Sequence, residues 1–140
     1  MAEQRERVEP LLPVFVYGTL RPGGKNYPRY LQGTTAREEE ATVAGELYFV
    51  ADGGYPYLSP GEGTVRGELM EILPSLYRRT LRRLDALEDY DPTDEAGSLY
   101  LRRRATVRTA QGECREAWVY YWNCPTICGE KIPDGDFRSG

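Results

Sequence analysis

The sequence contains no histidine and only three cysteines among its 140 residues. Without an imidazole to accept the nucleophile's proton, serine–histidine–aspartate and cysteine–histidine catalysis are excluded. Cys114, Cys124 and Cys128 are an odd number with no paired spacing, so neither a disulfide framework nor a zinc site is favoured, and we expect free thiols and no metal. Any chemistry must therefore use carboxylates, tyrosines, backbone groups or a lone activated thiol.

Long apolar runs are also missing. No stretch of eighteen apolar residues is present, and the first ten residues, MAEQRERVEP, are charged where a secretory signal needs an apolar segment. The net charge of −4 and the pI of about 5.0 provide no overall attraction to phosphate-rich partners. These features predict a cytoplasmic protein that binds neither membranes nor nucleic acid.

The cations are nearly all arginine, and four of them fall at Arg78, Arg79, Arg82 and Arg83. On a helix, this group would form a solvated face that is paired with nearby acids. The alternative is a patch for an anionic partner, since arginine makes bidentate contacts to phosphate. Both interpretations stay open from the sequence.

The apolar pattern predicts one α+β domain over residues 13–140, preceded by a polar extension over residues 1–12. Alternating or continuous apolar runs predict five strands, at Val14–Tyr17, Thr42–Val50, Val65–Ile72, Tyr100–Thr109 and Ala117–Trp122. Helical spacing appears from Pro74 to Glu88. The Gly/Pro-rich segment 53–63 and the tail 125–140 are predicted to be loops. Five strands without alternating helices favour a curled or barrel-like sheet.

The first candidate site is the turn that follows the first strand, at Tyr17, Gly18, Thr19 and Leu20. A phosphate-binding loop is not favoured, because the Gly24-Lys25 pair comes one residue late for that motif. An irregular turn of this kind nevertheless exposes backbone N–H groups that can bind an anion or an oxyanion. A plain structural turn would look the same.

The second candidate is Glu88, one helical turn after Leu84 and therefore on the apolar face of the predicted helix. Partial burial there would raise the carboxyl pKa toward neutrality, which suits a general acid or base. The third feature is the tyrosine content, 11 residues against 3 phenylalanines. Most of these are expected to be core residues with a bonded hydroxyl, and a few to line a pocket.

Four segments in this order resemble the γ-glutamylcyclotransferase-like family, which includes AIG2-like proteins and γ-glutamylamine cyclotransferases. They are Val14-Phe15-Val16-Tyr17-Gly18-Thr19-Leu20, Gly54-Tyr55-Pro56, Leu84-Asp85-Ala86-Leu87-Glu88-Asp89-Tyr90, and Tyr100 with Arg102. The resemblance implies a small mixed β-barrel with flanking helices and a cavity beside the turn. It also implies that Glu88 is the catalytic carboxylate and that Tyr17, Gly18, Thr19, Leu20 and Tyr100 bind substrate.

The implied reaction needs no cofactor or metal. The α-amine of a γ-glutamyl amine or peptide attacks its own γ-carbonyl, closes a five-membered ring and releases 5-oxoproline and an amine. The competing interpretation is a non-catalytic module that binds a small molecule in the same cavity, and a weaker one is a nucleic-acid accessory domain. The leaving amine and the oligomeric state are left open by the sequence.

Overall fold

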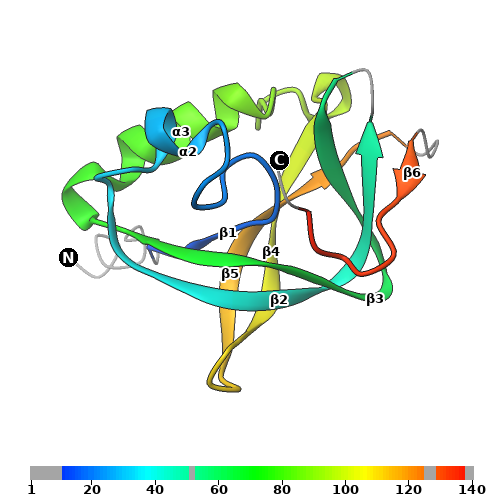
Figure 1. Cartoon of the computed structure of the whole chain (residues 1–140). Helices are drawn as coiled ribbons and strands as arrows, with labels where there is room; N and C mark the ends of the chain where they lie inside the picture. The colour runs from blue at the N-terminus through cyan, green and yellow to red at the C-terminus, as the bar shows by residue number, and fades with distance from the viewer. Residues whose placement is uncertain (1–10, 51–52, 125–128, 138–140) are drawn as a thin grey trace, which may run out of the picture.

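The sheet of this protein closes on itself to form a barrel (Figure 1). The computed structural model describes residues 11–50, 53–124 and 129–137. The elements, in chain order, are β1 (Val14–Val16), α2 (Tyr27–Tyr30), β2 (Thr35–Val50), β3 (Tyr55–Ile72), the 3₁₀ turn η1 (Pro74–Leu76), α3 (Tyr77–Leu87), the 3₁₀ turn η2 (Glu95–Gly97), β4 (Tyr100–Thr109), β5 (Cys114–Trp122) and β6 (Glu130–Lys131).

The ring of the barrel runs β3-β1-β5-β4-β2 and back to β3, while β6 pairs with the far end of β2. Strands β1 and β5 are parallel, and the other pairs are antiparallel, so the barrel is mixed. The predicted α+β fold with a barrel-like sheet and flanking helices is thereby confirmed.

Strand β1 is buried on both faces, which explains its continuous apolar sequence. Phe15 and Tyr17 belong to a cluster that also includes Val43, Val65 and other residues of the barrel strands. Val14 and Val16 face the opposite way, into a second cluster that includes Leu84 of α3. The strand thus lies between two apolar clusters, and the turn that follows it emerges where they meet.

Helix α3 covers one side of the barrel together with α2 and η1 (Figure 1). Its Tyr77, Thr80 and Leu84 are buried, as helical spacing predicts. The Tyr77 hydroxyl donates to the Leu12 carbonyl at 2.7 Å and accepts from Trp118 Nε1 at 3.0 Å. These bonds fix the start of the helix against β5 and the segment before β1.

The predicted loop over residues 53–63 is wrong, because β3 begins at Tyr55 and pairs with β2 through Ser59. Prolines at 56 and 60 suggested a loop, since proline donates no ladder bond. Strand β1 pairs with residues 68–70 of β3, so within the described ranges the first part of β3 has β2 as its one ladder neighbour. Where one side of a strand has no ladder partner, a proline whose missing N–H would point to that side removes no ladder hydrogen bond.

Strand β2 begins at Thr35 rather than at the predicted Thr42, and its first residues carry charge instead of an alternating apolar pattern. Partners on neighbouring elements satisfy that charge. Glu38 accepts hydrogen bonds from Tyr27 and Thr35, and Arg115 approaches Glu39 to 3.5 Å. Tertiary pairing therefore extends the strand beyond what its sequence pattern indicates.

Two short elements were not predicted, namely α2 and β6, the latter in the tail expected to be loop. Residues 125–128 and 138–140 of that tail lie outside the described residues. The segment 91–98, polar in sequence, contains the turn η2. None of the helices in the described ranges has the length and apolar character needed to cross a membrane.

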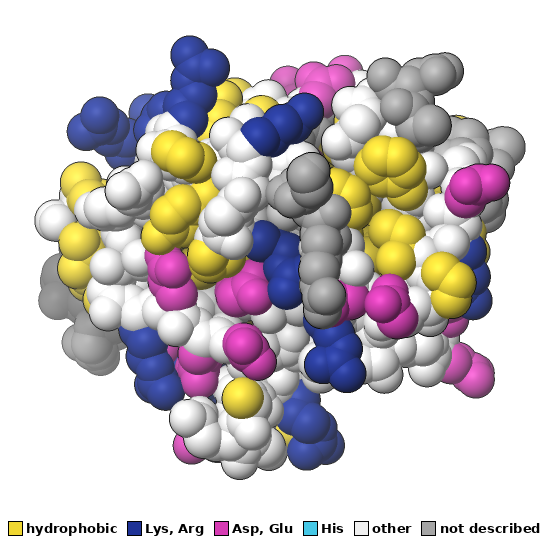
Figure 2. All heavy atoms as spheres, viewed as in Figure 1, with side chains coloured by type: hydrophobic (Ala, Val, Ile, Leu, Met, Phe, Trp, Pro, Cys, Tyr) yellow, Lys and Arg dark blue, Asp and Glu magenta, His cyan; other side chains and the backbone are white. Residues whose placement is uncertain are grey.

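The four arginines of α3 are exposed, as expected, but the expected pairing with acids is wrong. Figure 2 shows lysine and arginine side chains gathered over the helical side of the molecule. In the described part of the chain, none of the four forms an ion pair. Arg83 instead donates to the Arg29 carbonyl and stacks on Tyr30.

Candidate functional site

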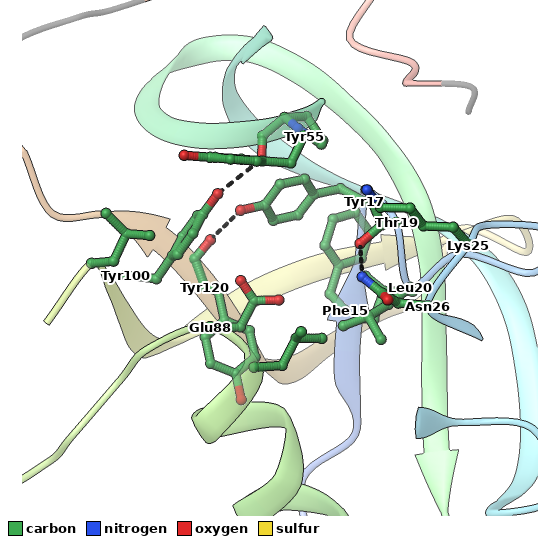
Figure 3. Close-up of a pocket in the computed structure, with 15 residues that line it drawn as sticks. Phe15, Tyr17, Thr19, Leu20, Lys25, Asn26, Tyr55, Glu88, Tyr100 and Tyr120 are labelled. Carbon is green, nitrogen blue, oxygen red and sulfur yellow. Dashed lines mark hydrogen bonds between the residues drawn. The ribbon is translucent and has the colours of Figure 1, made fainter. Parts of the chain in front are cut away.

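A cavity of about 180 Å³ opens beside the turn after β1 (Figure 3). The end of β1, the following turn, the start of β3, the end of α3 and strands β4 and β5 all contribute to it. Its lining residues are Phe15, Val16, Tyr17, Gly18, Thr19, Leu20, Lys25, Asn26, Tyr55, Pro56, Leu87, Glu88, Leu99, Tyr100 and Tyr120. All six residues predicted from the sequence as site residues therefore lie around one cavity.

Backbone and side-chain bonds within residues 18–26 fix the turn. Arg21 N donates to the Gly18 carbonyl at 3.1 Å, and Asn26 N donates to the Thr19 carbonyl at 2.9 Å. Asn26 Nδ2 also donates to Thr19 Oγ1 at 2.8 Å. A Cβ added to Gly24 would lie 2.4 Å from the Thr19 carbonyl oxygen, so this close approach requires glycine.

Arg21 ties the same turn to the rest of the protein. Its guanidinium binds Glu68 of β3 through two bonds of 2.8 and 3.0 Å. It also donates to Asp136 and to the Phe137 carbonyl, each at 2.7 Å. Charge-assisted bonds of this kind are strong and directional, so the turn is held in one geometry.

The backbone N–H groups of Gly18, Thr19 and Leu20 have no backbone acceptor among the described residues. Unpaired donors of this kind beside a cavity can bind a carboxylate or an oxyanion. These three N–H groups are therefore the candidate donors for the anion-binding role that the sequence suggested.

The C-terminus of α3 sets the position of Glu88. Tyr90 N donates to the Asp85 carbonyl at 2.9 Å, and Asp89 N donates to the Ala86 carbonyl at 3.2 Å. This is a Schellman motif, with Asp89 in the left-handed region at φ 55°. The motif ends the helix at Leu87 and leaves Glu88 as the capping residue, with its side chain in the cavity.

Burial raises the pKa of Glu88 from its usual 4.5 to about 7, and the negative charge of Asp85 adds to the effect. Figure 3 shows the Glu88 carboxyl group between the Tyr100 and Tyr120 side chains and the residues of the turn. A carboxyl with a pKa near neutrality can both accept and return a proton at physiological pH. The raised pKa that the sequence analysis expected is present.

Three tyrosines around the cavity have bonded hydroxyls, as predicted for most tyrosines of the chain. Tyr17 donates to the Tyr120 carbonyl at 2.6 Å, Tyr100 to the Pro56 carbonyl at 3.0 Å, and Tyr120 to Asp85 Oδ1 at 2.6 Å. Burial raises the pKa of all three hydroxyls, so they stay neutral. Their rings shape the cavity, and their hydroxyls fix its walls.

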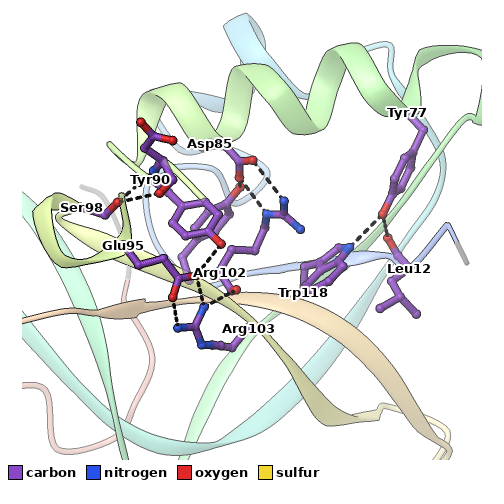
Figure 4. A network of polar contacts seen from close by, with 11 residues as sticks. Leu12, Tyr77, Asp85, Tyr90, Glu95, Ser98, Arg102, Arg103 and Trp118 are labelled. Carbon is purple, nitrogen blue, oxygen red and sulfur yellow. Dashed lines mark hydrogen bonds and ion pairs between the residues drawn. The ribbon is translucent and has the colours of Figure 1, made fainter. Parts of the chain in front are cut away.

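Asp85, one turn before Glu88, belongs to a polar network (Figure 4) and accepts a hydrogen bond from Tyr120, which lines the cavity. Arg102 forms two bonds with its carboxylate, of 2.8 and 3.2 Å. The guanidinium also lies over the rings of Trp118 and Tyr90, at 4.4 and 5.5 Å from their centroids. The network joins α3 to strands β4 and β5 beside the cavity.

Several lining residues were not identified from the sequence, notably Lys25, Asn26 and Pro56. Lys25 and Asn26 come five and six residues after Leu20, the last residue of the predicted turn, and this proximity was the available signal. Pro56 comes from the segment misjudged as a loop. The cysteine predictions hold for Cys114 and Cys124, which are free and exposed, and Cys128 lies outside the described residues.

No group of three or more cysteine, aspartate or glutamate side chains in the described ranges is arranged to hold a metal ion. Among the described residues, Glu88 and Lys25 are the only charged ones that line the cavity. The cavity therefore offers one titratable carboxyl, one cation, backbone donors and aromatic walls, which together suit proton transfer on a small polar molecule.

Comparison with known proteins agrees with this geometry. Residues 14–139 match the family model described as "Gamma-glutamyl cyclotransferase, AIG2-like". The chain is 34% identical over 110 residues to the gamma-L-glutamyl-butirosin B gamma-glutamyl cyclotransferase of Niallia circulans, covering 79% of this chain and 66% of the relative. It is 30% identical over 127 residues to a putative gamma-glutamylcyclotransferase of Methanocaldococcus jannaschii, covering 89% and 94% of the two chains.

Solved structures show the same fold. An uncharacterised protein from Pyrococcus horikoshii aligns with a TM-score of 0.61 at 29% identity, over 90% of this chain and 89% of the other. A mouse AIG2-like protein aligns with a TM-score of 0.67 at 22% identity, over 91% and 88% of the chains. The second likeness bears on the fold alone.

Proposed function

This chain belongs to the AIG2-like γ-glutamylcyclotransferase family, and from that membership and the cavity we propose that it cleaves γ-glutamyl amides. The α-amine of the substrate attacks the γ-carbonyl carbon, the bond to the leaving nitrogen breaks, and 5-oxoproline and a free amine are released. The observation that carries the proposal is the Glu88 carboxyl, held in the cavity with a pKa of about 7.

The substrate supplies its own nucleophile, so the absence of histidine is no obstacle. Ring closure is intramolecular, and a cavity that holds the glutamyl chain folded brings the amine next to the carbonyl. Well-oriented intramolecular reactions can gain about 7–11 kcal/mol relative to a bimolecular encounter. What the protein must add is proton transfer and stabilisation of developing charge.

Glu88 provides the proton transfer in this proposal. Ionised, it accepts a proton from the substrate ammonium and frees the attacking amine. Protonated, it returns that proton to the leaving nitrogen as the bond breaks. The regenerated carboxylate then accepts the second proton that the ring nitrogen must lose to become the lactam N–H. A positioned acid or base of this kind contributes about 10²–10⁴ in rate. A pKa close to the working pH lets the same carboxyl perform both steps.

The turn provides the charge stabilisation. The N–H groups of Gly18, Thr19 and Leu20 bind the oxyanion that develops on the γ-carbonyl oxygen or the α-carboxylate of the substrate. Because the turn is fixed before substrate enters, these donors need no reorganisation during reaction. Tyr17 and Tyr100 bind the glutamyl chain through their rings, since their hydroxyls are already bonded.

The test is release of 5-oxoproline from a panel of γ-glutamyl amines and peptides. Glu88→Gln keeps the size of the side chain and removes the proton transfer, so we expect a folded protein with at least about a hundredfold lower kcat. Asp89→Asn is the matched control: it removes one charge from the next, exposed residue and should keep activity.

If Glu88→Gln keeps most of the activity, Glu88 is not the proton-transfer residue, and Asp85 is the next residue to test. Tight binding of γ-glutamyl compounds by the wild-type protein without release of 5-oxoproline would favour the alternative, a non-catalytic binding module that uses the same cavity.

A further inference from the structure

The rim of the cavity carries a cation that the proposed reaction does not use. Of the fifteen lining residues only Lys25 and Leu99 are exposed, and these two define the rim. In the described part of the chain Lys25 forms no ion pair. The other lysine, Lys131, lies outside the cavity and pairs with Glu46 at 2.9 Å.

Lys25 and Glu88 lie on opposite sides of the cavity, with the rings of Phe15 and Tyr17 between them in this view (Figure 3). The backbone on both sides of Lys25 is fixed, because Gly24 N donates to the Arg21 carbonyl and Asn26 N to the Thr19 carbonyl. The lysine thus has a defined origin on a rigid turn, and its cation is directed at the cavity instead of at a protein acid.

We propose that Lys25 selects substrates whose leaving amine carries a carboxylate, that is, γ-glutamyl amino acids or peptides. The inference rests on the proposed function. A cavity of about 180 Å³ is small for a ligand site, so it holds the glutamyl part alone. During ring closure the α-amine and the leaving nitrogen are both bonded to the γ-carbonyl carbon, and both must reach Glu88. Only the rest of the leaving group can therefore extend through the opening to the rim.

At the rim, the leaving group meets one cation and one apolar side chain, Lys25 and Leu99. An amino acid offers the complement of both, a carboxylate and a carbon side chain. An amine that carries further positive charge would be repelled by Lys25, because none of the ion pairs among the described residues offsets the charge of this lysine. Glu88, the other charged group of the described lining, lies at the opposite side of the cavity (Figure 3).

The test compares γ-glutamylalanine with γ-glutamylethylamide, which differ only by the carboxylate. Ion pairs at exposed positions are modest, so we expect the wild-type kcat/KM to be about three- to tenfold higher for γ-glutamylalanine. Lys25→Met should bring the ratio close to one, and Lys25→Arg should retain it. Lys131→Met, which removes the same charge far from the cavity, should leave the ratio unchanged.

Two results would overturn the inference. A wild-type ratio of one or below shows that the rim does not recognise the carboxylate. If Lys25→Met lowers kcat/KM for both substrates by the same factor, Lys25 instead binds the α-carboxylate of the glutamyl group, which both compounds share. A third compound, γ-glutamylethylenediamine, carries a cation in place of the carboxylate and should be the poorest of the three, improving in Lys25→Glu.

Calorimetry on the Glu88→Gln variant, which measures the dissociation constants of γ-glutamylalanine and γ-glutamylethylamide, tests this inference separately from the proposed function. Tighter binding of γ-glutamylalanine that is lost in Lys25→Met supports the rim assignment, even if wild-type protein releases no 5-oxoproline and the proposed reaction fails. Turnover of both compounds without a preference, together with equal dissociation constants, keeps the reaction and overturns the rim assignment.

Discussion

Arg102 Nε lies 2.8 Å from Asp85 Oδ1, in a salt bridge whose two side chains are only 14% and 13% exposed. Because the charge of Asp85 helps to raise the pKa of Glu88, the guanidinium that compensates this charge limits the rise. Arg102→Met should therefore shift the pKa of Glu88 further upward, by about half a unit to one unit. The pH dependence of kcat/KM for 5-oxoproline release measures this shift.

Arg103→Met is the control for that change. Arg103 pairs with Glu95 at 2.8 Å, but these side chains are 44% and 41% exposed and lie away from Asp85. Its removal should leave the pH profile in place. Arg102→Met should also destabilise the fold by about 1–3 kcal/mol, since it leaves a partly buried carboxylate with fewer partners. An unchanged profile in Arg102→Met would contradict the electrostatic link.

The rate should depend on pH through Glu88 itself. The carboxyl must be ionised to accept the substrate's ammonium proton, and burial raises its pKa to about 7. The kcat/KM of the wild-type enzyme should thus rise with pH and level off above an apparent pKa of about 7. A profile that is already flat from pH 5 upward would show that the essential carboxyl has an ordinary pKa and is exposed to water.

The contribution of Glu88 to the free energy of unfolding should fall as pH rises, whereas kcat/KM should increase. Glu88 has a higher pKa when folded, about 7, than its usual 4.5, so the folded state favours the protonated carboxyl. Its contribution to stability is fully present below pH 4.5 and is lost as pH rises through 7. Relative to wild type, Glu88→Gln should gain up to about 3 kcal/mol at pH 8 and nothing at pH 4. Urea unfolding at both pH values measures the difference.

Gly18 should tolerate no side chain, because a Cβ there would lie 2.7 Å from Pro56 Cγ and 3.1 Å from Cδ. Gly18→Ala should displace the turn and lower kcat/KM about tenfold or more. Pro56→Ala removes both clashing atoms, and the double variant should recover part of the loss. If the loss of kcat/KM in the double variant equals the product of the losses in the two single variants, this contact is not the cause.

Asp89 occupies the left-handed conformation that ends α3, at φ 55°. Glycine reaches this conformation without a Cβ penalty, so Asp89→Gly should stabilise the protein by about 0.5–1 kcal/mol. Asp89→Val should destabilise it by about 1–2 kcal/mol, because a branched side chain is strained there. The unfolding midpoints of the two variants should move in opposite directions from wild type.

Two of the candidate sites have a local signal in the sequence, whereas the roles of their residues and the choice of Tyr100 came from the family resemblance. Helical spacing from Leu84 places Glu88 on the apolar face, and α3 has that spacing. The strand that ends in Tyr17 and the turn after it were recognisable for the same reason: a continuous apolar run followed by glycine describes a buried strand and its exit. Local periodicity is a property of the sequence itself, so these parts of the fold could be predicted.

Other parts depend on contacts between distant segments. Residues 38–40 carry three glutamates and would not be assigned to a strand by pattern, yet Tyr27 and Arg115 approach these acids from other elements. Pro56 belongs to a strand because only one side of that strand is paired at its position. The position of Lys25 at the cavity likewise follows from the path of the turn, which Arg21 fixes through Glu68 and Asp136.

The parallel pairing of Val14 with Trp118 has a consequence for how the chain folds. The hydroxyl of Tyr17 reaches the carbonyl of Tyr120 across 103 positions of sequence, and Trp118 N donates to the Pro13 carbonyl. During synthesis on the ribosome, β1 must wait for β5 to emerge before it gains this neighbour, and loop closure over such a distance is slow. We therefore expect the cavity to form only after β5 has been synthesised and has paired with β1.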